Sequence, residues 1–200
     1  CTTMIDKWAA EAEIPVFEVP VGFKYFSQLL FDGAIGIGGE ESAGASFLKK
    51  DGTVWTTDKD GMIMALLSME IMAVMGRSAL KMADESVEEF GNPSFGRIDA
   101  PCKKEQKQIL KQMSAELITA TTVDGDPITN IRTTSLYNDM PIDGVRVETD
   151  KGWFVARPSG TEDLYKIYGE SYKGDLGLVA LLTAGEEIVN AALNGTIETE

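Results

Sequence analysis

The residues from Met62 to Met75 form the most apolar stretch of this 200-residue chain, interrupted only by Ser68 and Glu70. The stretch is shorter than the ~20 residues that span a bilayer, and a helix that is apolar on nearly every side must be buried. We therefore predict a helix at the centre of an α/β layer. Five of the nine methionines lie in this stretch, and because methionine fills irregular gaps, core packing explains them without a metal site.

The segments before this helix alternate between helical and extended patterns. Helices are expected at residues 4–12 and 22–32, and short strands at 16–19, at 34–38 and on both sides of an Asp51-Gly52 turn. A helix that opens a chain and leads into a strand usually follows a strand as well. We therefore predict an α/β layer domain, a mixed sheet with helices, that lacks part of its start.

The pattern breaks between Phe90 and Pro101, where glycine, asparagine and proline are typical of an interdomain connection. We place the domains at residues 1–97 and 98–200. The second domain is predicted to have a polar helix at 103–114, strands at 128–134, 144–149, 153–157 and 164–171, and a last helix at 176–193. Helix, strands and helix in blocks predict a smaller α+β domain.

Composition excludes several classes of function. Thirty-two acidic against eighteen basic residues give a net charge of −14, which repels nucleic acids and anionic membranes, so neither is an expected partner. The absence of histidine excludes Ser-His-Asp and Cys-His catalysis and imidazole zinc sites. With only Cys1 and Cys102, no disulfide framework is expected, and the cytoplasm is the predicted compartment. The segment Asp124-Gly125-Asp126-Pro127 has too few carboxylates for a Mg²⁺ or Ca²⁺ site and is interpreted as a turn.

An acidic, glycine-flanked loop at residues 38–44 follows a predicted strand and contains Glu40 and Ser42. Carboxylates accept hydrogen bonds from adjacent sugar hydroxyls, and the flanking glycines allow close backbone approach. A solvated turn would contain the same residues. Lys59 lies at the start of the apolar helix, where it can reach a ligand or take part in helix capping.

A second loop joins a strand that ends at Arg157 to a turn rich in hydroxyl and N–H groups. These groups belong to Ser159, Gly160 and Thr161. An arginine fork matches phosphate oxygens, and the turn adds neutral donors. A structural turn in which Arg157 pairs with Glu162 or Asp163 is equally compatible with the sequence. Lys24 and Lys59 are expected as further cations for an anion.

Four motifs, in this order, resemble the C-terminal half of bacterial phosphoglucomutases, which belong to the α-D-phosphohexomutase superfamily. They lie at residues 22–26, 39–44, 56–61 and 157–163, and the resemblance extends from about Met4 to Ile188. It implies most of the family's third domain, an α/β layer, followed by its fourth, an α+β domain that closes over the substrate. By the same resemblance, the sugar hydroxyls contact Glu40, Ser42, Lys59 and Gly22, and the phosphate that is not transferred contacts Arg157, Ser159, Gly160 and Thr161.

The resemblance also implies a reaction. The family interconverts glucose 1-phosphate and glucose 6-phosphate through a phosphoserine and a bisphosphate intermediate, with Mg²⁺ and glucose 1,6-bisphosphate as cofactors. The family's Thr-Ala-Ser-His-Asn-Pro and Asp-Gly-Asp-x-Asp-Arg segments do not occur in this sequence. We therefore expect a C-terminal fragment with no catalytic or metal-binding residue of its own, inactive without the N-terminal domains of the same enzyme. A stand-alone, non-catalytic sugar-phosphate-binding module is the alternative.

Overall fold

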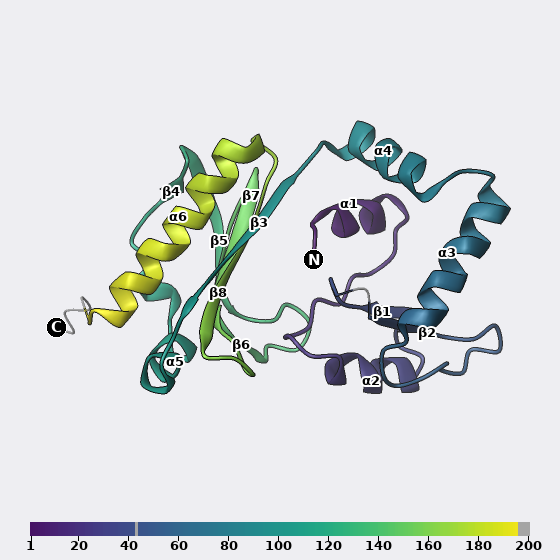
Figure 1. The fold of residues 1–200 in the computed structure, drawn as a ribbon, viewed down its shortest axis with the longest axis horizontal. Helices are drawn as coiled ribbons and strands as arrows, with labels where there is room; N and C mark the ends of the chain where they lie inside the picture. The colour runs from purple at the N-terminus through teal and green to yellow at the C-terminus, as the bar shows by residue number, and fades with distance from the viewer. Residues whose placement is uncertain (43, 196–200) are drawn as a thin grey trace. The chain divides into compact units, whose positions relative to one another are not determined.

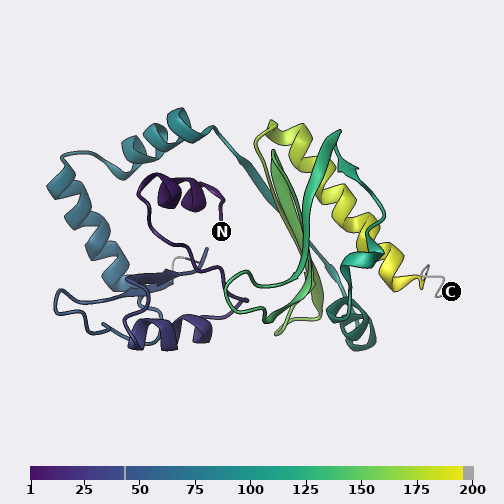
Figure 2. The ribbon, with the colours of Figure 1, turned by 180° about the vertical axis from the view of Figure 1, so that it is seen from behind.

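The computed structural model describes residues 1–42 and 44–195, and the chain divides into two compact units, Cys1–Gly91 and Asn92–Glu200 (Figures 1 and 2). The first unit combines helices with a small sheet and the second is an α+β unit, so the predicted order of an α/β layer followed by an α+β domain is confirmed.

The first unit contains a single antiparallel pair of strands among its described residues. Its elements are α1 (Met4–Glu11), α2 (Lys24–Phe31), β1 (Ile37–Gly39), β2 (Ala45–Phe47), α3 (Gly61–Met75) and α4 (Ala79–Phe90). Ile37 pairs with Phe47, and the predicted turn at Asp51-Gly52 forms between Leu48 and Val54, which make an isolated bridge. The strand expected at 16–19 does not form, because these residues pair with no other strand of the described chain.

The small core of the first unit lies between α2 and the hairpin formed by β1 and β2. Leu30 is completely buried there together with Phe23, Leu29 and Ile35. Gly38 of β1 permits this packing, because a Cβ at this position would lie 2.9 Å from the ring of Phe26. The core therefore fixes the start of the acidic loop that follows β1.

Helix α3 forms where it was predicted, but the prediction that it is buried is wrong. It begins at the cap of Asp60, whose carboxylate accepts from the N–H groups of Met62 and Ile63, and it ends at Gly76 in the left-handed conformation. No residue of α3 is buried, and the side chain of Met62 is 81% exposed. Strand β2 contacts α3, but within the described chain the contacts of α3 leave its apolar side chains half-buried or exposed.

The second unit is built on a six-stranded, entirely antiparallel sheet in the order β3-β8-β7-β6-β5-β4. Its elements are β3 (Ser94–Pro101), α5 (Lys104–Lys111), a 3₁₀ turn (Ala115–Leu117), β4 (Thr122–Val123), β5 (Asp126–Thr134), β6 (Pro141–Thr149), β7 (Gly152–Pro158), β8 (Leu164–Ser171) and α6 (Gly174–Leu193). Strand β3 was expected to be a connection. All eight of its residues pair with β8, so residues 94–97, assigned from the sequence to the first domain, form part of this sheet.

Helix α6 covers one face of this sheet (Figure 1). By length and composition α6 is apolar enough to cross a membrane, as is the pair α3 and α4 together, although that pair bends by 76°. In α6 the apolar side instead forms the core, where Leu181, Gly185 and Val189 are buried and pack near Phe154 and Ile167. Because side chains alternate along strands, the next residues of β7 and β8 lie on the other face, among them Arg157 and Lys166.

Candidate functional site

The loop between β7 and β8 begins at Arg157, near the end of β7. Pro158 pairs with Tyr165 across the two strands, and the N–H of Ser159 donates to the carbonyl of Leu164 at 2.8 Å, which closes the loop. The hydroxyl oxygen of Ser159 accepts from the N–H of Glu162 at 3.2 Å. Ser159 is buried, so the predicted phosphate loop is a compact hairpin connection with a fixed base.

The two acidic residues of this loop pair with lysines. Lys166 lies 2.8 Å from a carboxylate oxygen of Glu162, and Lys107 of α5 lies 3.0 Å from Asp163. Lys107 also donates to the backbone carbonyl of Glu162. The structural turn in which Arg157 pairs with Glu162 or Asp163 is therefore not the arrangement observed.

Arg157 forms no ion pair with any carboxylate in the described part of the chain. Its guanidinium lies 5.8 Å from the ring centre of Tyr168, a cation–π distance that leaves the N–H fork open. Gly160 and Thr161 are exposed at the loop tip, and neither has a hydrogen bond to another described residue. An arginine fork beside open N–H and hydroxyl donors can bind an oxyanion.

Lys107 and Lys166 are the residues that sequence reasoning missed at this loop. Lys166 follows Glu162 by four residues, and strand alternation places it on the face that Arg157 shares, so the sequence contained a signal for it. The contact of Lys107 joins residues 55 positions apart in the chain, and no local pattern predicts such a contact.

In the first unit, two of the four residues that are predicted to contact the sugar, Glu40 and Lys59, contact each other directly. The ammonium of Lys59 donates to a carboxylate oxygen of Glu40 at 2.8 Å. This hydrogen bond and the negative charge of Glu40 raise the pKa of Lys59. The side chain of Lys59 is 49% exposed and that of Glu40 is 20% exposed. The pair presents a donor and an acceptor side by side, as recognition of neighbouring hydroxyls requires.

Backbone contacts hold this pair in place. The N–H of Glu40 donates to the carbonyl of Gly44 at 2.9 Å and closes the acidic loop. Gly44 is required there, because a Cβ would lie 2.4 Å from Cδ of Lys59. The next residue, Asp60, caps α3 and accepts from the indole N–H of Trp55 at 3.2 Å, and these hydrogen bonds lower the pKa of Asp60. Lys59 is thus oriented by a glycine on one side and a capped helix on the other.

The other predicted residues of the first unit lie nearby in sequence without direct contacts to the pair. Ser42 is exposed in the turn of the acidic loop. Gly22 precedes α2 with φ +128, and its carbonyl accepts from the N–H of Tyr25. Lys24 lies 5.0 Å from the ring centre of Tyr25. Among the residues described, no hydrogen bond joins Ser42 or Gly22 to Glu40 or Lys59.

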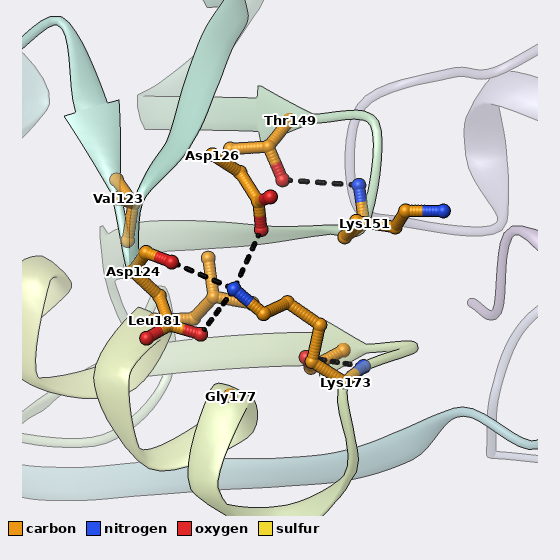
Figure 3. Close-up of a pocket in the computed structure, with 9 residues that line it drawn as sticks. Val123, Asp124, Asp126, Thr149, Lys151, Lys173, Gly177 and Leu181 are labelled. Carbon is orange, nitrogen blue, oxygen red and sulfur yellow. Dashed lines mark hydrogen bonds and ion pairs between the residues drawn. The ribbon is translucent and has the colours of Figure 1, made fainter.

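A small pocket in the second unit, near the start of α6, is occupied by a lysine of the chain (Figure 3). The ammonium of Lys173 lies 2.7 Å from Asp124 and 3.1 Å from Asp126. The predicted turn at Asp124-Gly125 forms with both residues at positive φ. Lys173 thus pairs with both carboxylates, and residues 1–42 and 44–195 contain no group of three or more potential metal ligands. These residues do not fit the Mg²⁺ that the predicted reaction requires, so no step is assigned to a metal here.

Two family models match the chain, one in each unit. Residues 1–90 match "Phosphoglucomutase/phosphomannomutase, alpha/beta/alpha domain III". Residues 98–177 match "Phosphoglucomutase/phosphomannomutase, C-terminal domain". The matched residues include the acidic loop with Glu40, Lys59 and the loop that begins at Arg157.

Curated relatives agree with this assignment. A phosphoglucomutase from Komagataeibacter xylinus is 47% identical over 190 residues, which are 95% of this chain and 34% of that protein. A chloroplastic phosphoglucomutase from Arabidopsis thaliana is 29% identical and matches 86% of this chain and 30% of its own length. The chain thus spans about a third of the length of these relatives.

A solved structure shares the fold. The phosphoglucomutase parafusin from Paramecium, in its open form, superposes with a TM-score of 0.68 at 23% identity, over 97% of this chain and 37% of that chain. Both family models, the bacterial relative and this fold lead to one conclusion: the chain belongs to the phosphoglucomutase/phosphomannomutase family and contains its domain III followed by its C-terminal domain.

Proposed function

We propose that the chain is part of a phosphoglucomutase that interconverts glucose 1-phosphate and glucose 6-phosphate through a phosphoserine and a bisphosphate intermediate. In this enzyme the first unit recognises sugar hydroxyls, and the second unit binds the phosphate that is not being transferred. The 47% identity to a bacterial phosphoglucomutase supports the reaction, although that identity covers a third of the relative.

The main support for the proposal is the open guanidinium of Arg157. The chain has a net charge of −14, yet this guanidinium forms no ion pair with the described carboxylates, while both acids of its own loop are held by lysines. An arginine left open among hydroxyl and N–H donors is suited to bind the oxygens of a phosphoryl group in a bidentate manner. Ser159, Gly160 and Thr161 supply the neutral donors around it.

The sugar side of the proposal is based on the Glu40–Lys59 pair. The carboxylate accepts from one hydroxyl and the ammonium donates to the next oxygen, so the pair distinguishes a polyol from an apolar ligand. Ser42 in the same loop adds a hydroxyl, and the backbone at Gly22 adds a contact from the start of α2. These four residues remain proposed sugar contacts.

We place the transferring chemistry outside these 200 residues. Phosphoryl transfer depends on positioning and charge stabilisation around a nucleophile and a metal. The phosphoserine, Mg²⁺ and the reaction with glucose 1,6-bisphosphate then belong to the N-terminal domains of the same enzyme. The chain alone is expected to bind a hexose phosphate and to have no mutase activity.

Thermal unfolding with ligand tests the binding proposal, because a ligand that binds only the folded state raises the free energy of unfolding. At ten times the dissociation constant the gain is about 1.4 kcal/mol. Glucose 1-phosphate and glucose 1,6-bisphosphate should both stabilise the chain. Arg157→Ala should lose this response, Glu40→Gln should weaken it for sugar phosphates but not for inorganic phosphate, and Lys151→Ala, an exposed control, should retain it.

A second measurement separates the mutase from a stand-alone binding module. The chain is mixed with the N-terminal domains of the Komagataeibacter relative, and glucose 6-phosphate formation is assayed. If the chain is part of a mutase, the mixture forms glucose 6-phosphate, and a mixture that contains the Arg157→Ala variant does not. Ligand-dependent stabilisation without any restored activity supports the binding module. If neither sugar phosphate stabilises the chain but activity is restored, the site forms only with the N-terminal domains; if both are absent, the assigned phosphate loop is rejected.

A further inference from the structure

Strand β3 forms one edge of the six-stranded sheet. All eight of its residues pair with β8, which makes it longer than a typical strand of about five to six residues. Among residues 1–42 and 44–195, no strand pairs with its other side. An edge of this kind presents N–H and C=O groups that another strand can bind, so the residues of β3 determine which strand fits.

The backbone groups that point away from β8 belong to the odd-numbered residues of β3. The N–H of Cys102 donates to the carbonyl of Asp163 at 3.0 Å, and these two residues continue the uninterrupted register of β3 and β8. In an antiparallel ladder, alternate residues bond to the same neighbour. The even residues therefore bond to β8, and the odd ones point their polar groups to the free edge. Pro101, which has no N–H, occupies an odd position, as expected for proline on an edge strand.

The side chains of the odd residues are exposed, and two of them have opposite charges. Strand β3 alternates between half-buried even residues and exposed odd ones. The side chains of Arg97 and Asp99 are 50% and 30% exposed and form an ion pair at 3.2 Å. Lys166 of β8 is in register with Asp99 on the same face. This edge therefore does not share the strong negative charge of the chain, which is −14 in total.

We propose that β3 pairs antiparallel with β3 of a second copy of the chain, around a twofold axis that passes through Ile98. In this register Arg97 of each copy lies opposite Asp99 of the other, and Ile98 lies opposite itself. The outward N–H and C=O groups of these residues then bond across the interface. Such a pairing is self-complementary, as a twofold interface requires. The inference goes beyond the proposed function and does not depend on it.

The charges of β3 select this register over its neighbours. Charged residues on an edge strand usually prevent pairing, and like charges directly opposite each other are destabilising. A shift by two residues would place Arg97 opposite Arg97, or Asp99 opposite Asp99. A shift by one residue would turn the side chains of one copy to the other face. Because one strand pair buries little surface, we expect a weak dimer that forms at high protein concentration.

Exchanging the charges tests the register. Arg97→Asp alone and Asp99→Arg alone each place like charges opposite each other, so each should weaken dimerisation by about tenfold in analytical ultracentrifugation. An equimolar mixture of the two variants restores both opposite-charge pairs between copies, although neither variant has the ion pair within its own strand. Its dissociation constant should return to within about threefold of the original value.

Two further variants serve as controls. Lys50→Asp makes the same change in net charge as Arg97→Asp, at an exposed site of the first unit, and should leave dimerisation unchanged. The double variant Arg97→Asp/Asp99→Arg has both opposite-charge pairs in its own homodimer and should dimerise like the original chain. Its recovery shows that the single variants lose dimerisation through charge and not through misfolding.

Amide hydrogen exchange locates the interface, because α3 also exposes apolar side chains through which copies can associate. The N–H groups of the odd residues from 95 to 99 should exchange more slowly as the protein concentration rises. Arg97→Asp should lose this protection. The N–H groups of the even residues, which bond to β8 in every copy, should exchange at the same rate at all concentrations.

Three outcomes overturn the proposal. A mixture that dimerises no better than the single variants shows that Arg97 and Asp99 are not opposite each other. Exchange rates of the odd residues that do not depend on concentration, in a chain whose mass increases, assign the association to another surface. A chain that stays monomeric at millimolar concentration shows that the edge of β3 remains unpaired.

Discussion

At the scale of single residues, Gly144 determines whether Arg157 can occupy its place. A Cβ on Gly144 would lie 2.2 Å from the carbonyl oxygen of Ala156 and 2.6 Å from Cβ of Arg157. We expect Gly144→Ala to lower the free energy of unfolding by about 1–3 kcal/mol, the usual cost of overpacking. It should also weaken sugar-phosphate binding, because β7 must shift to relieve the contact.

Gly160→Ala is the matched comparison for this prediction. A Cβ at Gly160 would meet nothing within 4 Å, so the free energy of unfolding should stay unchanged in chemical denaturation. Equal losses of stability in the two variants would contradict the steric explanation for Gly144. If Gly160→Ala loses sugar-phosphate binding but keeps its stability, the added Cβ interferes with the contact between the loop backbone and the ligand.

Glu148 connects two arginines on the same face of the sheet. Its carboxylate accepts from Arg132 and Arg146, each at 2.6 Å, and Arg146 also stacks 4.2 Å from the ring centre of Trp153. Burial alone would raise the pKa of Glu148, but the hydrogen bonds and charges of the two arginines outweigh it and lower the pKa. Glu148 therefore stabilises the fold above the ordinary carboxyl pKa, and this contribution is lost as pH falls through the lowered value.

The pH dependence of unfolding tests this role of Glu148. Glu148→Gln should lower the free energy of unfolding by about 1–3 kcal/mol at pH 7, the scale of hydrogen bonds to charged groups. The difference from the original chain should shrink as pH falls below 4. Asp51→Asn, at an exposed carboxylate whose pKa is lowered by hydrogen bonds from Thr53, should have a smaller effect. A difference that does not depend on pH would exclude the charge of Glu148 as the cause.

At the scale of elements, the sequence predicted what depends on local periodicity. Strand β8 and helix α6 were expected at residues 164–171 and 176–193 and are found at Leu164–Ser171 and Gly174–Leu193. Strand β3 was missed because the glycine, asparagine and prolines between Phe90 and Pro101 were interpreted as an interdomain connection. In the structure, a Cβ at Gly96 would lie 3.1 Å from Leu178 of α6, so this glycine serves a packing contact that only the fold reveals.

The same distinction applies to the candidate site. Arg157 and the hydroxyls of its turn were predicted from local chemistry. The choice between an open arginine and one paired with Glu162 or Asp163 depended on two lysines. Lys166 holds Glu162 from four residues away, and Lys107 of α5 reaches Asp163 from 56 residues away. The spacing of residues in the sequence does not predict the contact of Lys107, so the sequence alone could not decide between the two interpretations.

Helix α6 depends on close approach to the sheet, and Gly185 tests this dependence. Alanine in place of glycine inside a helix normally gains about 1 kcal/mol. Here a Cβ would lie 2.8 Å from Ile167 and 3.2 Å from the ring of Phe154, so we expect Gly185→Ala to destabilise the chain by about 1–3 kcal/mol in denaturant unfolding. Asn190→Ala, at an exposed position of α6, should have no such cost. If Gly185→Ala instead raised the free energy of unfolding, α6 and the sheet would be able to move apart and accommodate the added Cβ without cost.

At the scale of the whole molecule, net charge and apolar surface act against each other. The charge of −14 favours solubility through mutual repulsion. Helix α3 nevertheless exposes Met62, Leu66 and Met69 by 81%, 60% and 62%. Their spacing of four and three residues places them on one side of the helix. A contiguous apolar strip of this kind is typical of surfaces that associate.

We therefore expect the 200-residue chain to bind the dye ANS and to increase in mass with concentration in analytical ultracentrifugation, more strongly in high salt, where charge repulsion is screened. A Leu66→Glu/Met69→Glu variant should reduce both signals and keep the helical circular dichroism of the original chain. Leu176→Glu is the control, because Leu176 is 85% exposed but lies on α6, outside the strip. A chain that stays monomeric without ANS binding at high salt would show that α3 is covered in solution. An equal effect of the Leu176 control would assign the association to exposed leucine in general, whereas an effect confined to the α3 variant identifies the apolar strip as the surface responsible.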